Sequence, residues 1–212
     1  LGCHSSFCIL SYRKAVLVKK GYTVAEKLFV NAQQLLEYSF QLGHKVLSDG
    51  FRPDLIIGVW RGGAPIAIAL QELFAYNGIL VNHYPVRISS YVGIEKQGDE
   101  IEIGGMRDLL SIMASAKSIL IVDDVFETGR TIQELIDKIE SMLGEKTPEV
   151  VRVATIFAKP EKRISNIKPD YFIRTTKKWL VFPHELVGLT EEEIRENKDL
   201  ALAEVSRMQM SR

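Results

Sequence analysis

Apolar residues along the chain follow two patterns, short unbroken runs and longer stretches with helical spacing. The unbroken runs predict strands that are buried on both faces, as in a parallel sheet. They cover residues 54–60, 79–88, 118–124, 149–159 and 170–175. Helical spacing predicts helices over about 24–47, from Pro65 onward, over 106–113 and over 131–143. Strands that alternate with helices predict one α/β domain, a mainly parallel sheet flanked by helices.

Three segments depart from this alternation. Residues 89–105 are polar and contain four glycines, which predicts a long loop or a projecting hairpin, and long loops in compact domains often act as lids. Residues 1–23 have an unusual composition and predict a disordered or loosely docked tail, or the remnant of a processed or artificial N-terminus. Thr190 and Glu193 form a capping-box pattern that predicts a helix within 191–212. The domain is therefore expected over 24–190.

Composition narrows the classes of function. Lys+Arg and Asp+Glu both number 27, and a net charge of zero disfavours nucleic-acid binding through bulk positive charge. The two cysteines, Cys3 and Cys8, provide no disulfide framework or Cys-rich metal site. No apolar run reaches the roughly 18 residues typical of a membrane span. We therefore expect a cytoplasmic protein without a nucleic-acid partner or a membrane contact.

The most chemically informative stretch is Ser118–Leu135. Its predicted strand ends in Asp123 and Asp124, and Glu127 follows before a loop of small residues that leads into a helix. Ligands of open parallel sheets bind beyond the carboxyl ends of the strands, and a helix N-terminus favours an anion such as phosphate. Carboxylates repel phosphate, so they indicate a ligand that also offers hydroxyls, a divalent cation or a developing positive charge. The alternative is a strand that ends in solvated acids before a threonine N-cap.

The stretch Ile121–Thr131, IVDDVFETGRT, resembles the phosphoribosyl-pyrophosphate (PRPP) signature of the type I phosphoribosyltransferases. The resemblance implies their fold, with a small C-terminal hood. It implies that Asp123 and Asp124 hold the ribose hydroxyls, directly or through Mg²⁺. The 5′-phosphate loop corresponds to Glu127, Thr128, Gly129, Arg130 and Thr131. In the branch that uses 6-oxopurines, the acid at Glu127 lies near purine N7 and is the proposed general base, so Glu127 and Asp124 are the expected catalytic residues.

A second stretch, Gly58–Ala67 (GVWRGGAPIA), resembles the pyrophosphate loop of this family. Arg61 would contact pyrophosphate, and Gly62 and Gly63 would bring backbone amides close to it. Family members often have a non-proline cis peptide bond here, which corresponds to Trp60–Arg61. Taken alone, the Gly-Gly pair is equally typical of a tight turn.

Two further stretches resemble the purine-specific members. Thr155–Arg163 (TIFAKPEKR) places Lys159 at a strand end, where those enzymes have a lysine that reaches the 6-oxo group. In Trp179–Leu186 (WLVFPHEL), Trp179 would stack on the purine, and His184 replaces the usual tryptophan. The resemblance also implies that the backbone of Leu180 or Val181 contacts the edge of the purine ring. Glu185 would contact the metal together with Asp123 and Asp124. Alone, a lysine after a strand is usually solvated, and a tryptophan is often a core residue.

The expected lid contains Ser89, Ser90 and Tyr91, a region that in the family closes over the reaction centre and excludes water. The resemblance thus implies transfer of the phosphoribosyl group from PRPP to a 6-oxopurine, with Mg²⁺ as cofactor and a dimer or tetramer as the assembly. Two alternatives are a PRPP-sensing regulator that binds nucleic acid and a pyrimidine- or orotate-type transferase. Zero net charge disfavours the first, and Trp179 with Lys159 disfavours the second.

Overall fold

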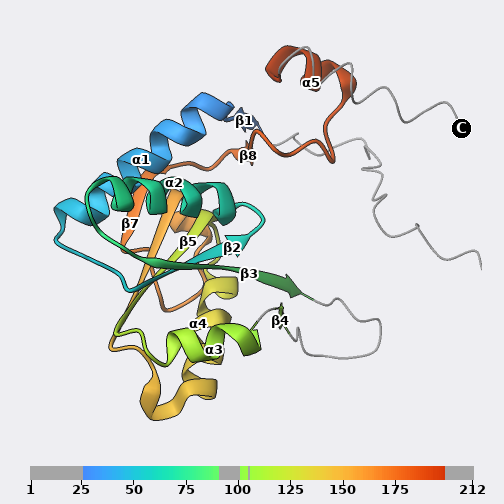
Figure 1. Cartoon of the computed structure of the whole chain (residues 1–212). Coiled ribbons are helices and arrows are strands. Elements are labelled where there is room, and N and C mark those ends of the chain that lie inside the picture. Colours follow the sequence, from blue (N-terminus) through green and yellow to red (C-terminus); the bar gives the residue numbers. More distant parts are fainter. Residues whose placement is uncertain (1–25, 91–100, 105, 199–212) are drawn as a thin grey trace, which may run out of the picture.

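The computed structural model describes residues 26–90, 101–104 and 106–198 (Figure 1). Within these residues, six strands form one sheet in the order β4-β3-β2-β5-β6-β7. They are β2 (Leu55–Trp60), β3 (Asn82–Ser90), β4 (Ile101–Gly104), β5 (Ser118–Phe126), β6 (Val150–Ala158) and β7 (Tyr171–Thr175). Neighbouring strands are parallel except β3 and β4, which are antiparallel. The mainly parallel sheet is confirmed. Of the segment 89–105, residues 89–90 and 101–104 pair as antiparallel strands, whereas 91–100 and 105 lie outside the described residues.

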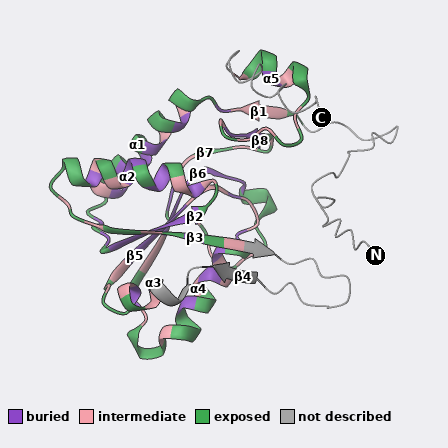
Figure 2. Ribbon diagram, turned by 45° about the vertical axis from the view of Figure 1, so that its right-hand side comes forward, coloured by how far each residue is buried: buried purple, intermediate pink, exposed green. Residues whose placement is uncertain are grey.

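Helices cover both faces of this sheet, as Figures 1 and 2 show. On one face lie α1 (Ala32–Ser48) and α2 (Gly63–Tyr76), which pack against each other and against the central strands. On the other face lie α3 (Met106–Met113) and α4 (Arg130–Leu143). Short 3-10 turns cover 144–146 and 160–162. The flanking helices expected from the sequence are therefore present.

The core forms two layers because successive side chains of a strand point to opposite faces. Ile56 packs among the residues of the α1 and α2 layer, whereas Leu55 and Ile57 pack in the α3 and α4 layer. The same division holds in β5, where Leu120 faces the first layer and Ile121 the second. Burying one such side chain contributes about 1.5–3 kcal/mol. These two layers hold the strand ends, and hence the candidate site, in fixed positions.

A small second sheet lies beside the main one and forms the hood. It pairs β1 (Lys27–Phe29) in parallel with β8 (Trp179–Val181). The prediction of a helix from about residue 24 was wrong over this segment. Helix α1 begins only after Asn31, whose side chain accepts a hydrogen bond from Gln34 N (2.8 Å), while Gln34 Oε1 accepts one from Asn31 N (3.0 Å). The hood therefore combines the two ends of the domain.

The C-terminal capping box is confirmed. Thr190 Oγ1 accepts a hydrogen bond from Glu193 N (3.2 Å), and α5 (Glu191–Asn197) begins at this cap. The predicted tail at 1–23 and the end of the C-terminal segment lie outside the described residues, as does Tyr91 of the expected lid. Among the described residues, no helix is long and apolar enough to span a membrane.

Candidate active site

The two adjacent acids lie within strand β5, which ends two residues after Asp124, at Phe126. Asp123 and Asp124 are both partly buried, and Asp124 N donates a hydrogen bond to Asp123 Oδ1 (2.9 Å). Burial raises the pKa of Asp123 well above its ordinary value, and the negative charge of Asp124 raises it further. Burial also raises the pKa of Asp124 to about 6, with a contribution from the carboxylate of Glu185. Hydroxyl donors or a cation would stabilise these carboxylates in their charged form.

These acids fit a Mg²⁺ ion that is shared with a substrate. Mg²⁺ usually binds through one or two carboxylates together with substrate oxygens and water. Within the described part of the chain, no group of three His, Cys, Asp or Glu side chains forms a metal site. Glu185 Oε2 accepts a hydrogen bond from Phe182 N (2.8 Å), which holds this carboxylate in its own turn. The carboxylates that fit such an ion are therefore those of Asp123 and Asp124, and metal binding by these two residues and by Glu185 stays a prediction.

The expected phosphate loop connects β5 to the N-terminus of α4. Gly129 has φ +77°, and a Cβ there would lie 2.0 Å from Ser165 Oγ and 2.4 Å from Phe126 Cζ, so only glycine fits. Thr128 Oγ1 accepts a hydrogen bond from Arg130 N (3.3 Å). Helix α4 begins at Arg130, so Arg130 and Thr131 occupy its first turn, whose N–H groups have no helical partners. The loop thus has the geometry of an anion site.

The expected pyrophosphate loop lies directly against the acid pair. The peptide bond between Trp60 and Arg61 is cis, as the resemblance implied. A Cβ on Gly62 would lie 1.9 Å from Asp124 Oδ2, and one on Gly63 would lie 2.2 Å from the carbonyl oxygen of Val122. Both glycines are therefore required by close approach between the loop and β5.

The turn that contains His184 lies near Arg61. Burial lowers the pKa of the His184 imidazole, and the charge of Arg61 lowers it further, although Glu185 opposes this. The ring of His184 stacks on that of Phe182, with centroids 6.1 Å apart and planes 10° from parallel. The hood turn is thus packed through His184 at the position where a tryptophan was expected.

Two lysines converge on the third acid. Lys159 Nζ lies 3.2 Å from Glu127 Oε2, and Lys162 Nζ lies 2.5 Å from Glu127 Oε1. Burial raises the pKa of Glu127, but the hydrogen bonds from Lys162 and Lys159 outweigh it, so this pKa lies below its ordinary value. The structure brings together Glu127 and Lys159, which directly follow β5 and β6, and the predicted roles require this proximity. Sequence reasoning missed Lys162, because six other lysines and arginines within 159–178 made it inconspicuous.

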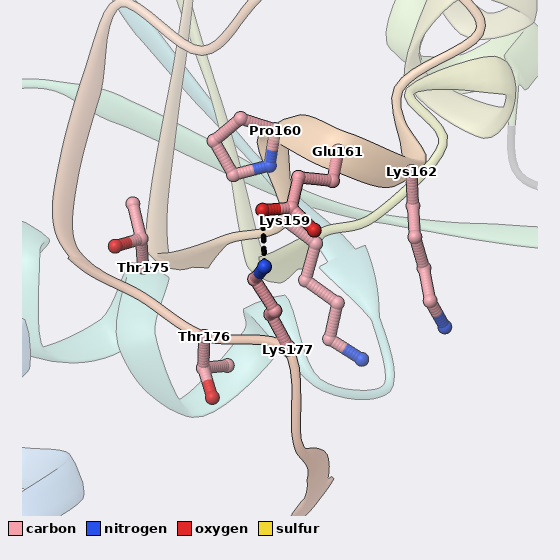
Figure 3. Close-up of a pocket in the computed structure, with 7 residues that line it drawn as sticks. All are labelled: Lys159, Pro160, Glu161, Lys162, Thr175, Thr176 and Lys177. Atoms are coloured by element: carbon pink, nitrogen blue, oxygen red, sulfur yellow. Dashed lines mark ion pairs between the residues drawn. The ribbon is translucent and has the colours of Figure 1, made fainter.

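A cavity of about 370 Å³ opens beside Lys159 (Figure 3). Its walls are the turn Pro160–Lys162 and the loop 175–177. Figure 3 shows Lys177 reaching across to Glu161, and their Nζ and Oε1 atoms are 2.5 Å apart. Three lysines and two threonines thus line the space next to Pro160 and Glu161, although most of the lining surface is apolar.

The hood residues differ sharply in exposure. The side chain of Trp179 is 61% exposed, whereas Leu180 and Val181 are buried. A large aromatic ring that remains exposed next to a buried pair is available for stacking on a ligand. Ser89 and Ser90 end strand β3 and pair with Glu102 and Ile101 of β4, so their part of the expected lid is a hairpin strand.

The comparisons with known proteins agree with this geometry. The profile of the phosphoribosyl transferase domain matches residues 33–187. The hypoxanthine-guanine phosphoribosyltransferase of Lactococcus lactis is 32% identical over 150 residues, which cover 69% of this chain and 74% of that protein. The dog enzyme of the same name is 30% identical over 153 residues, covering 69% and 67%.

Solved structures give the same result at the level of the fold. A purine phosphoribosyltransferase from Pyrococcus horikoshii matches with a TM-score of 0.60 and 26% identity, over 77% of this chain and 97% of that one. The xanthine-guanine-hypoxanthine phosphoribosyltransferase of Helicobacter pylori matches with a TM-score of 0.62 and 18% identity, over 86% and 99%. The sequence motifs, the sheet and these matches together establish that the chain belongs to the type I phosphoribosyltransferase family.

Proposed function

We propose that this chain transfers the 5-phosphoribosyl group of PRPP to N9 of a 6-oxopurine and releases pyrophosphate. Hypoxanthine and guanine are the favoured acceptors, and xanthine is the third candidate. The relatives at about 30% identity carry the name hypoxanthine-guanine phosphoribosyltransferase, which supports a role in purine salvage.

One observation carries the choice of a purine acceptor. Lys159 is only 6% exposed, directly follows the parallel strand β6 and contacts Glu127, the acid that follows the ribose-facing pair. An ammonium group has three N–H donors, so Lys159 can donate to the 6-oxygen of a purine in addition to Glu127. With the 6-oxygen of the purine on Lys159, the carboxylate of Glu127 would lie beside N7 and could accept its proton. The exposed ring of Trp179 provides a stacking surface for the purine.

The residues would act in the following way. The N–H groups of the 127–131 loop hold the 5′-phosphate, and Arg61 with the backbone of Gly62 holds the pyrophosphate. As the bond from C1′ to pyrophosphate breaks, positive charge develops on the ribose, and the carboxylates of Asp123 and Asp124 stabilise it. Glu127 accepts or shares the N7 proton while N9 attacks C1′. The hairpin with Ser89 and Ser90 would exclude water, which otherwise hydrolyses PRPP.

Asp123 and Asp124 would hold the Mg²⁺ ion, which neutralises the charge of PRPP and orients its oxygens. The contribution of Glu185 to this ion, the cytoplasmic location and the dimeric or tetrameric assembly remain predictions.

The proposal is tested with a panel of bases incubated with Mg²⁺ and PRPP, followed by measurement of nucleotide and pyrophosphate. We expect nucleotide from hypoxanthine and guanine, and little or none from adenine, uracil or orotate. Product from orotate or uracil alone would assign a pyrimidine-type transferase. If no base gave product, tight binding of nucleic acid in a parallel filter assay would instead support a PRPP-sensing regulator.

A further inference from the structure

We propose that Lys162 is a positioning residue of the transfer reaction, which holds the carboxylate of Glu127 while Lys159 binds the 6-oxygen of the purine. This inference rests on the proposed function and assigns a task to a residue of the Thr155–Arg163 stretch to which the family resemblance gave none. Lys162 comes from the 3-10 turn 160–162 that follows β6.

The two lysines divide the oxygens of one carboxylate between them. Lys162 Nζ contacts Glu127 Oε1 at 2.5 Å, and Lys159 Nζ contacts the other oxygen, Oε2, at 3.2 Å. The contact with Lys162 is the shorter of the two. The side chain of Lys159 is 6% exposed, whereas that of Lys162 is 52% exposed. Lys162 therefore approaches Glu127 from the solvent side, and Lys159 from inside the protein.

This arrangement resolves a competition for Lys159. A purine oxygen that binds Lys159 must share its ammonium group with the full negative charge of Glu127, which is the stronger acceptor. A second cation on the other carboxylate oxygen weakens the hold of Glu127 on Lys159. When the purine takes up Lys159, Lys162 keeps Glu127 paired and fixes its orientation. Glutamate has one more rotatable bond than aspartate, so its carboxylate needs such a restraint more.

Backbone hydrogen bonds place Lys162 where it can do this. Lys159 N donates to the carbonyl oxygen of Phe126 (2.8 Å), and Lys162 N donates to that of Lys159 (3.0 Å). Ile164 N and Ser165 N both donate to the carbonyl oxygen of Thr128, each at 3.1 Å. The turn that carries Lys162 is thus tied to the phosphate loop on both sides of Glu127.

The same geometry predicts that removal of Lys162 leaves the fold intact. An ion pair between two partly exposed side chains contributes little to stability, because solvent screens it. The two groups whose charge acts on Glu127 are Lys159 and Lys162, and Lys159 remains in the variant. An effect of the substitution on turnover would therefore come from the position and partners of Glu127.

The test compares Lys162→Ala, Lys162→Arg and a control, Lys177→Ala, in steady-state kinetics with hypoxanthine and PRPP. Lys177 is also exposed and ion-paired beside the same cavity, but its partner is Glu161. We expect Lys162→Ala to raise KM for hypoxanthine about 5- to 10-fold, with KM for PRPP and Tm nearly unchanged. Lys162→Arg should restore most of the loss, and Lys177→Ala should leave KM within about twofold of the wild-type value.

A titration followed by the ¹³Cδ signal of Glu127, assigned with Glu127→Gln, gives a second readout that needs no turnover. The pKa of Glu127 should rise in Lys162→Ala and return in Lys162→Arg. Equal kinetic effects of Lys162→Ala and Lys177→Ala, or an unchanged Glu127 titration, would overturn the role of Lys162. A wild-type protein that makes no nucleotide from any base would instead refute the proposed function, while the titration would still report on the pairing.

Discussion

Gly62 lies against the carboxylate of Asp124, so closely that a Cβ at position 62 would be 1.9 Å from Asp124 Oδ2. The backbone of Gly62, with φ −64° and ψ −34°, suits any residue. Only the approach to Asp124 therefore demands glycine. The contact couples the expected pyrophosphate loop to the expected ribose and metal site.

Replacement of this glycine should separate activity from stability. Gly62→Ala should displace the Asp124 carboxylate and lower kcat/KM for PRPP at least about 100-fold, because a small misplacement of a binding group is costly. Steady-state kinetics with varied PRPP measure this effect. Gly78→Ala serves as the control, because Gly78 has φ +75° and free space around it. That variant should lose about 1–2 kcal/mol of stability and keep its activity. If Gly62→Ala kept its activity while Gly78→Ala lost activity, the coupling between Gly62 and Asp124 would be contradicted.

The raised pKa of Asp124 predicts a site that destabilises the ligand-free protein. Its folded-state pKa of about 6 lies above the ordinary value of 3.8, so folding favours the protonated form. The stabilising contribution is then full at low pH and is lost as pH rises through about 6. Asp124→Asn should accordingly gain about 1–3 kcal/mol at pH 7.5 and far less at pH 4, while activity falls. Denaturant unfolding at both pH values measures this, and an equal change at both would contradict it.

The same pair should set the acidic limb of the pH–rate profile. Mg²⁺ and ribose hydroxyls bind the ionised acids, so kcat/KM for PRPP should fall as pH drops below about 6. Glu127, whose pKa is lowered, stays charged over this range and should not contribute. Binding of Mg²⁺ with PRPP should release protons near pH 6, which calorimetry in two buffers of different ionisation enthalpy detects. Proton uptake would contradict this assignment.

The exposed ring of Trp179 should contribute to purine binding without contributing to stability. Trp179→Ala should raise KM for hypoxanthine about 5- to 100-fold, because stacking of a base on an aromatic ring is worth about 1–3 kcal/mol. Trp179→Phe should lose much less. The chain has one other tryptophan, Trp60. In a Trp60→Phe variant, the quenching of tryptophan fluorescence when purine binds would therefore report on Trp179. Quenching that persists after removal of Trp179 would place the purine elsewhere.

Lys159 and Glu127 should affect different features of the reaction. Lys159→Met should lower kcat/KM for hypoxanthine about 10- to 100-fold, because a charged hydrogen bond to the 6-oxygen is lost. The small rate with adenine, if any, should not fall further, because adenine lacks that oxygen. Glu127→Gln should lower kcat, with a smaller effect on KM. A loss of equal size for both bases in Lys159→Met, or full turnover in Glu127→Gln, would refute the corresponding role.

Much of the fold follows from local pattern, because a strand buried on both faces needs an unbroken apolar run. Strands β2, β5 and β6 were predictable for this reason, and α4 was predictable from its apolar stripe. Strand β1 was not, since Lys27–Phe29 is short and its partner β8 is distant in the sequence. The apolar spacing that continues into α1 therefore suggested a longer helix. Strand β3 was placed about three residues early because Ile79 and Val81 pack as apolar loop residues before it.

The site was predictable where several residue types must occur together in order. The acid pair, the expected phosphate loop and the Gly-Gly turn lie together at the carboxyl ends of β2 and β5, and their binding roles stay predictions. The pairing of Lys162 with Glu127 could not be anticipated, because it depends on how the 160–162 turn folds back over the loop. The residue that holds Glu185 in place, Phe182, acts through its backbone, for which side-chain identity gives no signal.

The pairing of β1 with β8 also has a consequence for how the protein is made. Glu26 and Lys178, which form an ion pair beside these strands, are 152 positions apart. During synthesis, β1 is made early and β8, which carries Trp179, is made late. The β1–β8 pair can therefore form only after almost the whole domain has left the ribosome. A fragment limited to the family-matched residues 33–187 would lack that partner strand altogether. Such a fragment would leave the edge of β8 unpaired, so expression should begin upstream of residue 26.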